Sequence, residues 1–230
     1  MNAPVHTQLA LRHSYFEASA RSRVAQLLDA GSFREFLPPE VSQPSPHLAV
    51  LGIPGAFDDG VIVGSGQLGG KPVLLIAQEG QFMGGAVGEI HGAKIVGLLR
   101  RAIVERPAAV VFMVDSGGVR LHEANAGLIA ISEIMRAVLD TRAAGVPVIA
   151  LVGGSCGAFG GMGIVSRLCS AIVMSEEGRL ALSGPEVTET VAGVEEFDSK
   201  DRALVWRVTG GKHRYLTGDC AELVEDDAAS

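Results

Sequence analysis

The sequence predicts an α/β protein built around a parallel sheet. Two observations support this: apolar runs of strand length, and segments with apolar residues at helical spacing that alternate with those runs. The 30 glycines, more than regular helices and strands would use, are expected in loops where the backbone comes close to something. Runs that are apolar throughout are typical of strands buried on both faces, and their alternation with helices indicates right-handed crossovers. The 230 residues allow one domain or a tight pair.

The first part of the chain is expected to hold a flexible leader, one helix and several short strands. The leader is residues 1–13. Ser14 and Glu17 have the spacing of a capping box, so a helix is predicted from there to about Gly31. A proline-rich linker over residues 38–46 follows. The short strands are then predicted at Leu48–Ile53, Val61–Val63 and Val73–Ala77.

The second half is predicted to alternate between helix and strand. Helices are expected at Gly88–Val104, Glu123–Ala143, Phe159–Leu168 and, near the end, Asp201–Val208. Strands are expected at Ala108–Val114, Val146–Val152 and Ala171–Met174. The acidic tail, Glu222 to Asp227, is expected to be a solvated end of the chain.

Composition excludes several classes of function. A net charge of −7 and 5% aromatic residues argue against nucleic-acid binding, which favours basic surfaces and stacking platforms. The three cysteines form no C-x-x-C pair, so neither a disulfide framework nor a zinc site is expected, and a cytoplasmic setting fits best. Residues 143–166 carry no charge, but their proline and glycines favour a strand–turn–helix over a membrane span.

Two common motifs occur in misleading or uncertain contexts. Residues 64–69 match G-x-G-x-x-G, but a strand follows where a dinucleotide-binding loop needs a helix, so a turn is predicted. Residues 153–157 match G-x-S-x-G between a strand and a helix. A hydrolase triad of Ser155, His213 and either Asp198 or Asp201 therefore remains an alternative.

Two glycine clusters predict a site made of backbone groups. Gly117 and Gly118 follow one predicted strand, and Gly160 and Gly161 follow the next. Ligands of α/β proteins bind at such strand ends, and free N–H groups at helix N-termini attract anionic oxygen. Two such loops could form an oxyanion hole. Five nearby residues are candidate bases, with no geometry to choose among them: Glu79, Glu89, His91, His122 and Glu123.

Four segments resemble motifs of the β chains of acyl-CoA carboxyltransferases. Residues 116–123, SGGVRLHE, resemble their S-G-G-A-R-M-Q-E segment, and residues 82–88, FMGGAVG, resemble their F-M-G-G-S-M-G. Residues 182–187, LSGPEV, resemble their A-G-P-R-V, and residues 20–33 resemble their opening helix and turn. The order and spacing of these motifs identify the chain as a member of the crotonase-like carboxyltransferase superfamily.

Within that superfamily the chain resembles the β subunit of biotin-independent malonate decarboxylase over residues 14–226. Two departures from the bacterial acetyl-CoA carboxylase β chain agree with this: the four-cysteine zinc module is absent, and Glu186 replaces an arginine. The resemblance implies a crotonase fold, which is a superhelix of repeated β-β-α units with a parallel sheet. Residues 14–230 would form a single domain of this type.

The resemblance also implies an activity and partners. The activity would be decarboxylation of a malonyl thioester on an acyl carrier protein, giving an acetyl thioester and CO2, a carbon–carbon lyase reaction. The chain itself would bind no metal, nicotinamide or biotin, since the phosphopantetheine group arrives on the carrier protein. The γ subunit of the decarboxylase would supply the second half of the site. N–H groups around Gly117, Gly118, Gly160 and Gly161 would hold the thioester oxygen, and the substrate would contact Met83, Gly84, Gly85, Val119 and Phe159.

Two other functions compete with this one. A biotin-dependent acyl-CoA carboxylase uses a carboxyltransferase half of the same kind, which moves CO2 between biotin and the thioester. A non-catalytic subunit would instead dock the carrier protein while its partner performs the chemistry. Neither alternative needs a membrane or a nucleic acid.

Overall fold

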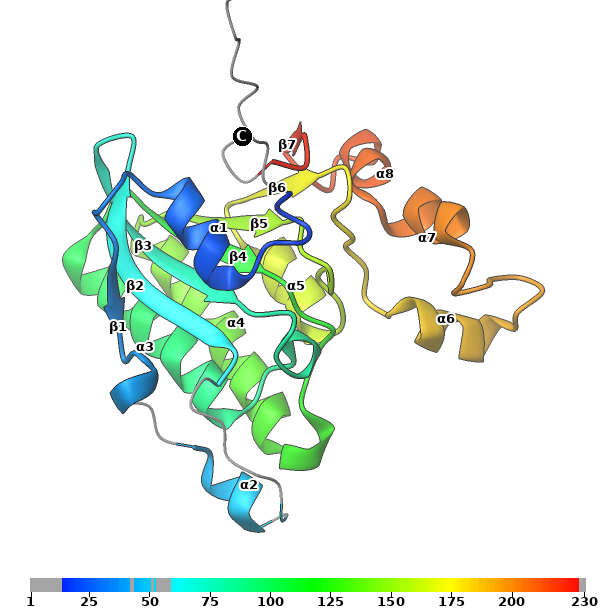
Figure 1. Ribbon diagram of the computed structural model, residues 1–230, viewed down its shortest axis with the longest axis horizontal. Helices are drawn as coiled ribbons and strands as arrows, with labels where there is room; N and C mark the ends of the chain where they lie inside the picture. The colour runs from blue at the N-terminus through cyan, green and yellow to red at the C-terminus, as the bar shows by residue number, and fades with distance from the viewer. Residues whose placement is uncertain (1–13, 42–43, 51, 53–58, 228–230) are drawn as a thin grey trace, which may run out of the picture.

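One mixed sheet organises the molecule (Figure 1). The computed structural model describes residues 14–41, 44–50, 52 and 59–227, and the expected leader lies outside these residues. Within the described part, seven strands pair in sequence order. They are β1 (Arg34–Phe36), β2 (Val61–Leu68), β3 (Lys71–Gln78), β4 (Ala109–Val114), β5 (Val148–Val152), β6 (Ala171–Ser175) and β7 (Glu222–Val224). The strands β3 to β7 are parallel, as predicted, whereas β1, β2 and β3 are antiparallel.

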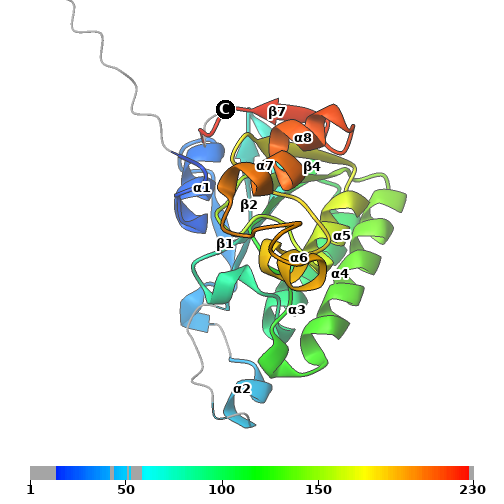
Figure 2. The same cartoon turned by 90° about the vertical axis from the view of Figure 1, so that its right-hand side faces the viewer.

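Helices cover both faces of the sheet. They are α1 (Ala20–Leu27), α2 (Pro46–Val50), α3 (Glu89–Glu105), α4 (Ala126–Ala143), α5 (Gly161–Leu168), α6 (Pro185–Ala192), α7 (Arg202–Thr209) and α8 (Gly211–Leu216). Single turns of 3-10 helix occur at η1 (Pro39–Val41), η2 (Met83–Gly85) and η3 (Leu121–Glu123). Helix α1 lies on one face, and α3, α4 and α5 lie on the other (Figure 2). Within the described residues no helix has the length and apolar character needed to cross a membrane.

Alternation of side chains along the strands builds a core on each face. Ile62 and Leu75 point toward α1 and pack with Val24, whereas Leu74 and Ile76 belong to the core beneath α3, α4 and α5. Since both faces are buried, the central strands are apolar throughout, which is the pattern that predicted them. A fully buried aliphatic side chain of this kind contributes about 1.5–3 kcal/mol.

The β-β-α repeat implied by the resemblance is present in reduced form. The helices α3, α4 and α5 each return the chain from one parallel strand to the next. After each strand the chain makes a second, much shorter β contact, which is a single-residue bridge. These bridges join Val87 to Val119, Ser116 to Ala158, and Ala158 to Leu180. They form a second layer at the carboxyl ends of the strands, where the predicted glycine clusters lie.

The first helix begins later than the capping box predicted. The Glu17 N–H does donate to Ser14 Oγ at 3.1 Å, but Ser14 also donates to Asp226 at 2.6 Å, which holds this segment against the C-terminal end of the chain. Helix α1 starts instead at Ala20, with Ser19 as its cap. The predicted capping box is therefore wrong as a helix start.

Two other predictions of local structure are wrong. Residues 46–50 form helix α2 rather than a strand, because Pro46 occupies the first helical position, where its fixed φ favours a helix. The remainder of that predicted strand, apart from Gly52, lies outside the described residues. The acidic tail is not a solvated end, since Glu222–Val224 form β7 and pair with β6.

The rejection of the dinucleotide motif is confirmed, but the turn predicted over residues 64–69 is wrong, because β2 continues through residue 68. Gly64 and Gly66 lie inside β2, and the β2–β3 hairpin turns at Gly69 and Gly70, both with positive φ. Gly66 has a packing role, because a methyl group there would lie 2.6 Å from the side chain of Leu28, just beyond α1. The uncharged stretch over residues 143–166 likewise forms β5, a turn and α5, as predicted.

Candidate active site

The loops that follow β3, β4 and β5 meet at the carboxyl end of the sheet. The Gly117 N–H donates to Gly84 O at 2.9 Å, which joins the first two loops. The Ser116 N–H donates to Gly157 O at 2.7 Å, and the Phe159 N–H donates to Ser116 O at 3.0 Å. The two glycine clusters predicted to converge are therefore hydrogen-bonded neighbours.

Glycine is needed where the two clusters touch. A methyl group on Gly160 would lie 3.4 Å from the Cα of Gly118, so the backbones are nearly in contact. Gly118 has φ +135° and Gly160 has φ +58°, backbone conformations that residues with a Cβ rarely adopt. Gly85 is still more confined, since its Cβ would lie 1.8 Å from Asp115 O.

Most N–H groups of the two clusters already have acceptors. Gly117 donates across the loops as described. Gly118 donates to the hydroxyl of Ser116 at 3.2 Å, and Gly160 donates to Leu182 O at 2.9 Å. Three of the four glycines expected to offer donors are therefore bonded within the protein.

Within the two glycine clusters, two N–H groups have no acceptor among the described residues, those of Val119 and Gly161. Each cluster thus contributes one. Gly161 is the first residue of α5, where the partial positive charge of the helix dipole adds to its own N–H. Both residues are partly exposed.

The sequence prediction named Val119 only as a lining residue. Its peptide plane is turned by the bridge to Val87, in which Val87 binds Gly118 O and accepts from the Arg120 N–H. In a parallel bridge the residue between those two bonds points its own N–H away from the partner. The free N–H of Val119 could be predicted from the sequence only if the residues paired in this bridge were already known.

The other predicted contact residues lie around the same loops in different environments. Met83 is 40% exposed beside Gly84 in the turn η2. Phe159 is buried, and the Arg179 guanidinium lies 5.6 Å from the centre of its ring. The Phe159 side chain therefore packs inside the protein.

His91 is part of a buried structural network. Its ring joins Gln78 Nε2 at 3.0 Å and Asp59 O at 3.1 Å. A carbonyl only accepts, so Nδ1 carries the proton and Nε2 accepts from Gln78. Burial, reinforced by the charge of Arg120, holds the pKa of His91 well below its ordinary value. A neutral ring with both nitrogens bonded is not placed to serve as a base.

Three of the other candidate bases are held by structural contacts. Glu123 is fully buried, pairs with Arg120 at 3.1 Å and accepts the Glu89 N–H at 2.7 Å. The Glu89 carboxylate accepts from the Ser45 hydroxyl at 3.2 Å. Glu79 accepts the N–H of Ala20, the first residue of α1, at 2.8 Å. These carboxylates fix the loops and helices around the glycine clusters.

His122 differs from them. It lies in η3, directly after the glycine loop, and its Nε2 is buried without a hydrogen-bond partner in the described part of the chain. Of the five candidate bases, His122 is the one whose side chain is not held by a hydrogen bond among the described residues.

The geometry does not support the hydrolase triad. A nucleophile elbow places its serine at the start of a helix, but α5 begins six residues after Ser155. No hydrogen bond joins the Ser155 hydroxyl to His213 within the described residues. The contact between Ser155 and Arg179 instead uses the serine's backbone oxygen.

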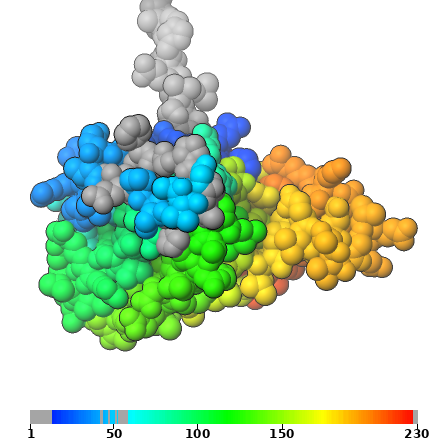
Figure 3. Space-filling view, turned by 90° about the horizontal axis from the view of Figure 1, so that it is seen from below, coloured from blue at the N-terminus to red at the C-terminus, as the bar shows by residue number. Residues whose placement is uncertain are grey.

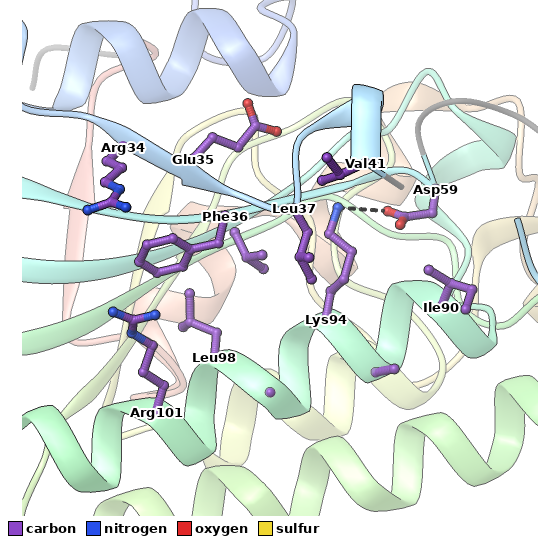
Figure 4. Close-up of a pocket in the computed structure, with 13 residues that line it drawn as sticks. Arg34, Glu35, Phe36, Leu37, Val41, Asp59, Ile90, Lys94, Leu98 and Arg101 are labelled. Carbon is purple, nitrogen blue, oxygen red and sulfur yellow. Dashed lines mark hydrogen bonds and ion pairs between the residues drawn. The ribbon is translucent and has the colours of Figure 1, made fainter. Parts of the chain in front are cut away.

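Two sizeable cavities lie away from the glycine clusters. One of about 780 Å³ lies between β1 and α3, with Phe36, Leu98 and Arg101 in its wall and the buried Lys94–Asp59 ion pair, 3.2 Å, at one end (Figure 4). Another of about 630 Å³ lies between α3 and α4. Neither includes a glycine of the two clusters.

The fold and the paired glycine loops define a crotonase-like α/β protein. The chain belongs to the carboxyl transferase domain family, whose sequence model matches residues 13–229. The fold class and the family resemblance predicted from sequence are therefore confirmed.

Individual relatives narrow the resemblance. The chain is 46% identical to the malonyl-S-ACP:biotin-protein carboxyltransferase of Malonomonas rubra, an alignment that covers 94% of this chain and 72% of the relative. It is 44% identical to a chain of the Pseudomonas malonate decarboxylase hetero-tetramer solved in complex with malonate, with a TM-score of 0.89, covering 95% of this chain and 80% of that one.

A more distant relative shows the limit of the match. The propionyl-CoA carboxylase beta chain of Saccharopolyspora erythraea is 32% identical, and 96% of this chain aligns with 39% of that protein. The chain therefore spans about two fifths of that relative's length.

Proposed function

We propose that this chain is one half of an enzyme that decarboxylates a malonyl thioester carried by an acyl carrier protein, giving an acetyl thioester and CO2. The observation that carries the proposal is the pair of free N–H groups, Val119 and Gly161, on two loops in backbone contact. The likeness to a malonate decarboxylase chain supports the choice of substrate.

The reaction needs little more than stabilisation of an oxygen anion. When the bond to the departing CO2 breaks, its electron pair moves onto the thioester carbonyl and an enolate forms. The negative charge then lies on the carbonyl oxygen, where two N–H donors would hold it. A preorganised donor of this kind typically lowers the barrier by about 3–4 kcal/mol. Protonation of the α-carbon completes the acetyl thioester.

Backbone donors suit this task. The Val119 and Gly161 N–H groups do not titrate, and their positions are set by the hydrogen bonds that surround them. They keep their orientation before the charge forms, so no reorganisation is needed during the reaction. The positive end of α5 adds to the attraction at Gly161.

The likeness to a multi-subunit enzyme supports a second subunit at this site. The similar Pseudomonas chain belongs to a hetero-tetramer. We expect a γ-type subunit to cover the glycine loops and exclude water, and the carrier protein to deliver the thioester on its phosphopantetheine arm. That arm is part of the substrate, so the chain itself needs no cofactor for this reaction.

A second candidate differs only in the fate of the carboxyl group. The Malonomonas rubra relative is a biotin-protein carboxyltransferase, and 46% identity favours transfer of the carboxyl group to a biotin protein as the alternative. The enolate and its two donors would be the same, but biotin would capture the CO2.

The experiment is release of labelled CO2 from malonyl carrier protein by this chain with its γ-type partner, with and without avidin. We expect release that avidin does not inhibit and that needs no biotin protein. Turnover only in the presence of a biotin protein, abolished by avidin, would establish the carboxyltransferase instead. No turnover under either condition would contradict both.

A further inference from the structure

A single buried carboxylate joins the two donor loops. Asp115 directly follows β4 and is 1% exposed. Its Oδ1 accepts the N–H of Cys156, in the loop after β5, at 2.7 Å. Its Oδ2 accepts from Arg23 Nη1 of α1 at 2.8 Å.

The carboxylate fits a slot that only glycines leave open. A methyl group on Gly80, in the loop after β3, would lie 2.6 Å from Asp115 Oδ2. One on Gly154 would lie 2.1 Å from the Asp115 carboxyl carbon. The Asp115 side chain is therefore enclosed by both flanking loops, and its position cannot shift without moving one of them.

Arg23 holds the other end of this contact. It is 2% exposed, donates to Tyr15 O at 2.8 Å and to Phe16 O at 3.3 Å, and lies over the Tyr15 ring at 4.6 Å. Burial raises the pKa of Asp115, and the nearby Glu79 acts in the same direction, whereas Arg23 and the Cys156 N–H lower it. The Asp115 carboxylate thus has two fixed donors and requires two acceptor oxygens.

Both free N–H groups lie a few residues beyond these anchors. Val119 comes four residues after Asp115, and Gly161 comes five residues after Cys156. We propose that Asp115 is a positioning residue that sets the spacing between the Val119 and Gly161 N–H groups, and so controls how well both reach the thioester oxygen. This proposal rests on the proposed function, because it assigns the two N–H groups to that oxygen.

The test measures donor alignment as well as rate. The complex with the γ-type partner is loaded with acetyl carrier protein labelled with 13C at the thioester carbonyl, and the stretching frequency of that carbonyl is recorded by infrared difference spectroscopy. Well-placed donors lower this frequency. The kcat and KM for malonyl carrier protein are measured on the same samples.

Two variants perturb the carboxylate in different ways. Asp115→Asn offers one acceptor and one donor where two acceptors are required. Gly80→Ala keeps the charge of Asp115 but places a methyl group 2.6 Å from its Oδ2, the oxygen that Arg23 binds, and so pushes the carboxylate from its slot. It decides the question where Asp115→Asn does not fold. Gly97→Ala is the control, because its Cβ meets nothing within 4 Å and it lies in α3, away from the loops.

We expect kcat to fall about 10- to 100-fold in both variants, as for a displacement of catalytic groups by about 1 Å, with KM within twofold. The bound carbonyl frequency should rise toward its value in free acetyl carrier protein. Gly97→Ala should match the unaltered protein in both measurements.

Folded variants that keep kcat within twofold would overturn the proposal. So would a lower kcat with an unchanged carbonyl frequency, because that result reports less folded enzyme rather than poorer alignment. If the unaltered complex lowers the carbonyl frequency but releases no CO2, the proposed decarboxylation is wrong, and the frequencies of the variants still decide the role of Asp115.

Discussion

At Val119 and Gly161 the backbone, rather than a side chain, offers the two N–H donors of the candidate site that have no acceptor among the described residues. The side chains nearby hold this backbone in place. Asp115 anchors the loops, and the buried side chains of Glu123 and His91 are hydrogen-bonded. Glycine is common in the two loops because the backbones approach each other closely and two of the glycines have left-handed φ values.

Neighbouring glycines should therefore respond differently to the same substitution. Gly118→Ala places a Cβ at φ +135° and should lower the free energy of unfolding by about 1–3 kcal/mol and reduce kcat. Gly117→Ala has no such strain, and its Cβ would lie 3.4 Å from Gly84 O, a contact that a small shift relieves. Urea unfolding and CO2 release check both variants. Equal losses in the two would show that backbone conformation is not the cause.

The buried His91 predicts a dependence of stability on pH. Its pKa lies well below the ordinary value in the folded protein, so below pH of about 6.5 the unfolded chain binds a proton that the folded chain does not. The contribution of His91 to the free energy of unfolding should be fully present above that pH. Below it, the free energy of unfolding should fall by up to about 1.4 kcal/mol per pH unit from this group.

His91→Gln should remove that contribution. Urea unfolding between pH 6.5 and 5 (about one and a half units below the ordinary histidine pKa) should give a steeper loss for the unaltered protein than for the variant. Identical slopes would mean that His91 is protonated in the folded protein, against the neutral ring described above.

At the scale of elements, the crossing of α3 and α4 shows how position decides the effect of a glycine. Gly92 of α3 faces α4, and its Cβ would lie 2.5 Å from that of Ala130. Gly97, further along α3, has open space around it.

The same change at these two positions should have opposite signs. Gly92→Ala should destabilise the protein by about 1–3 kcal/mol through overpacking. Gly97→Ala should stabilise it by about 0.5–1 kcal/mol through its helix propensity. Denaturant unfolding of both variants measures the difference, and a stabilising Gly92→Ala would show that the helices separate at no cost.

The elements that the sequence predicted best are the central strands and the helices that pack against them. The strands β3 to β6 and the helices α3 to α5 lie within a few residues of their predicted bounds, since their apolar periodicity follows directly from burial. The edge elements were harder to predict. β7 is only three residues, Glu222–Val224, and is held by pairing to β6 and by the Asp226–Ser14 contact, which no local pattern reveals.

The sequence predicted which loops form the candidate site, but not which of their N–H groups are free. The glycine clusters and their convergence follow from the order of strands and helices. Which N–H groups remain free depends on cross-loop bonds such as Gly117 to Gly84 and Gly160 to Leu182, which join residues at least 22 positions apart. These bonds leave Val119 and Gly161, and that outcome required the structure.

For the whole molecule, the C-terminal part stands out in shape and surface. Helices α6 and α7 project sideways from the body (Figure 3). Large apolar side chains are exposed on and around α6: Leu182 at 68%, Val187 at 56%, Val191 at 84% and Val194 at 60%. Since this segment continues from the strand bridges beside the glycine loops, we expect the γ-type partner to cover it.

A charge on this surface should weaken the complex. Val191→Asp should raise the dissociation constant about tenfold or more, because a buried valine contributes about 1.5 kcal/mol or more and 1.4 kcal/mol is a factor of ten. Val104→Asp is the matched control, since Val104 is 82% exposed at the far end of α3. Light scattering of the mixed subunits measures both. Equal affinities for the two variants would place the partner elsewhere.

The most direct test of the account compares Gly161→Pro with Gly161→Ala in the complete complex. Both add a Cβ against the Ile131 side chain, at 2.7 Å, but only proline removes the N–H. Proline suits the first position of α5, and Gly160, with φ 58° and ψ −135°, lies outside the helical region that a following proline disfavours. We predict that Gly161→Pro releases CO2 about 100- to 1,000-fold more slowly than Gly161→Ala. Equal rates for the two variants would contradict the backbone oxyanion hole and leave the chain as a docking subunit whose partner performs the chemistry.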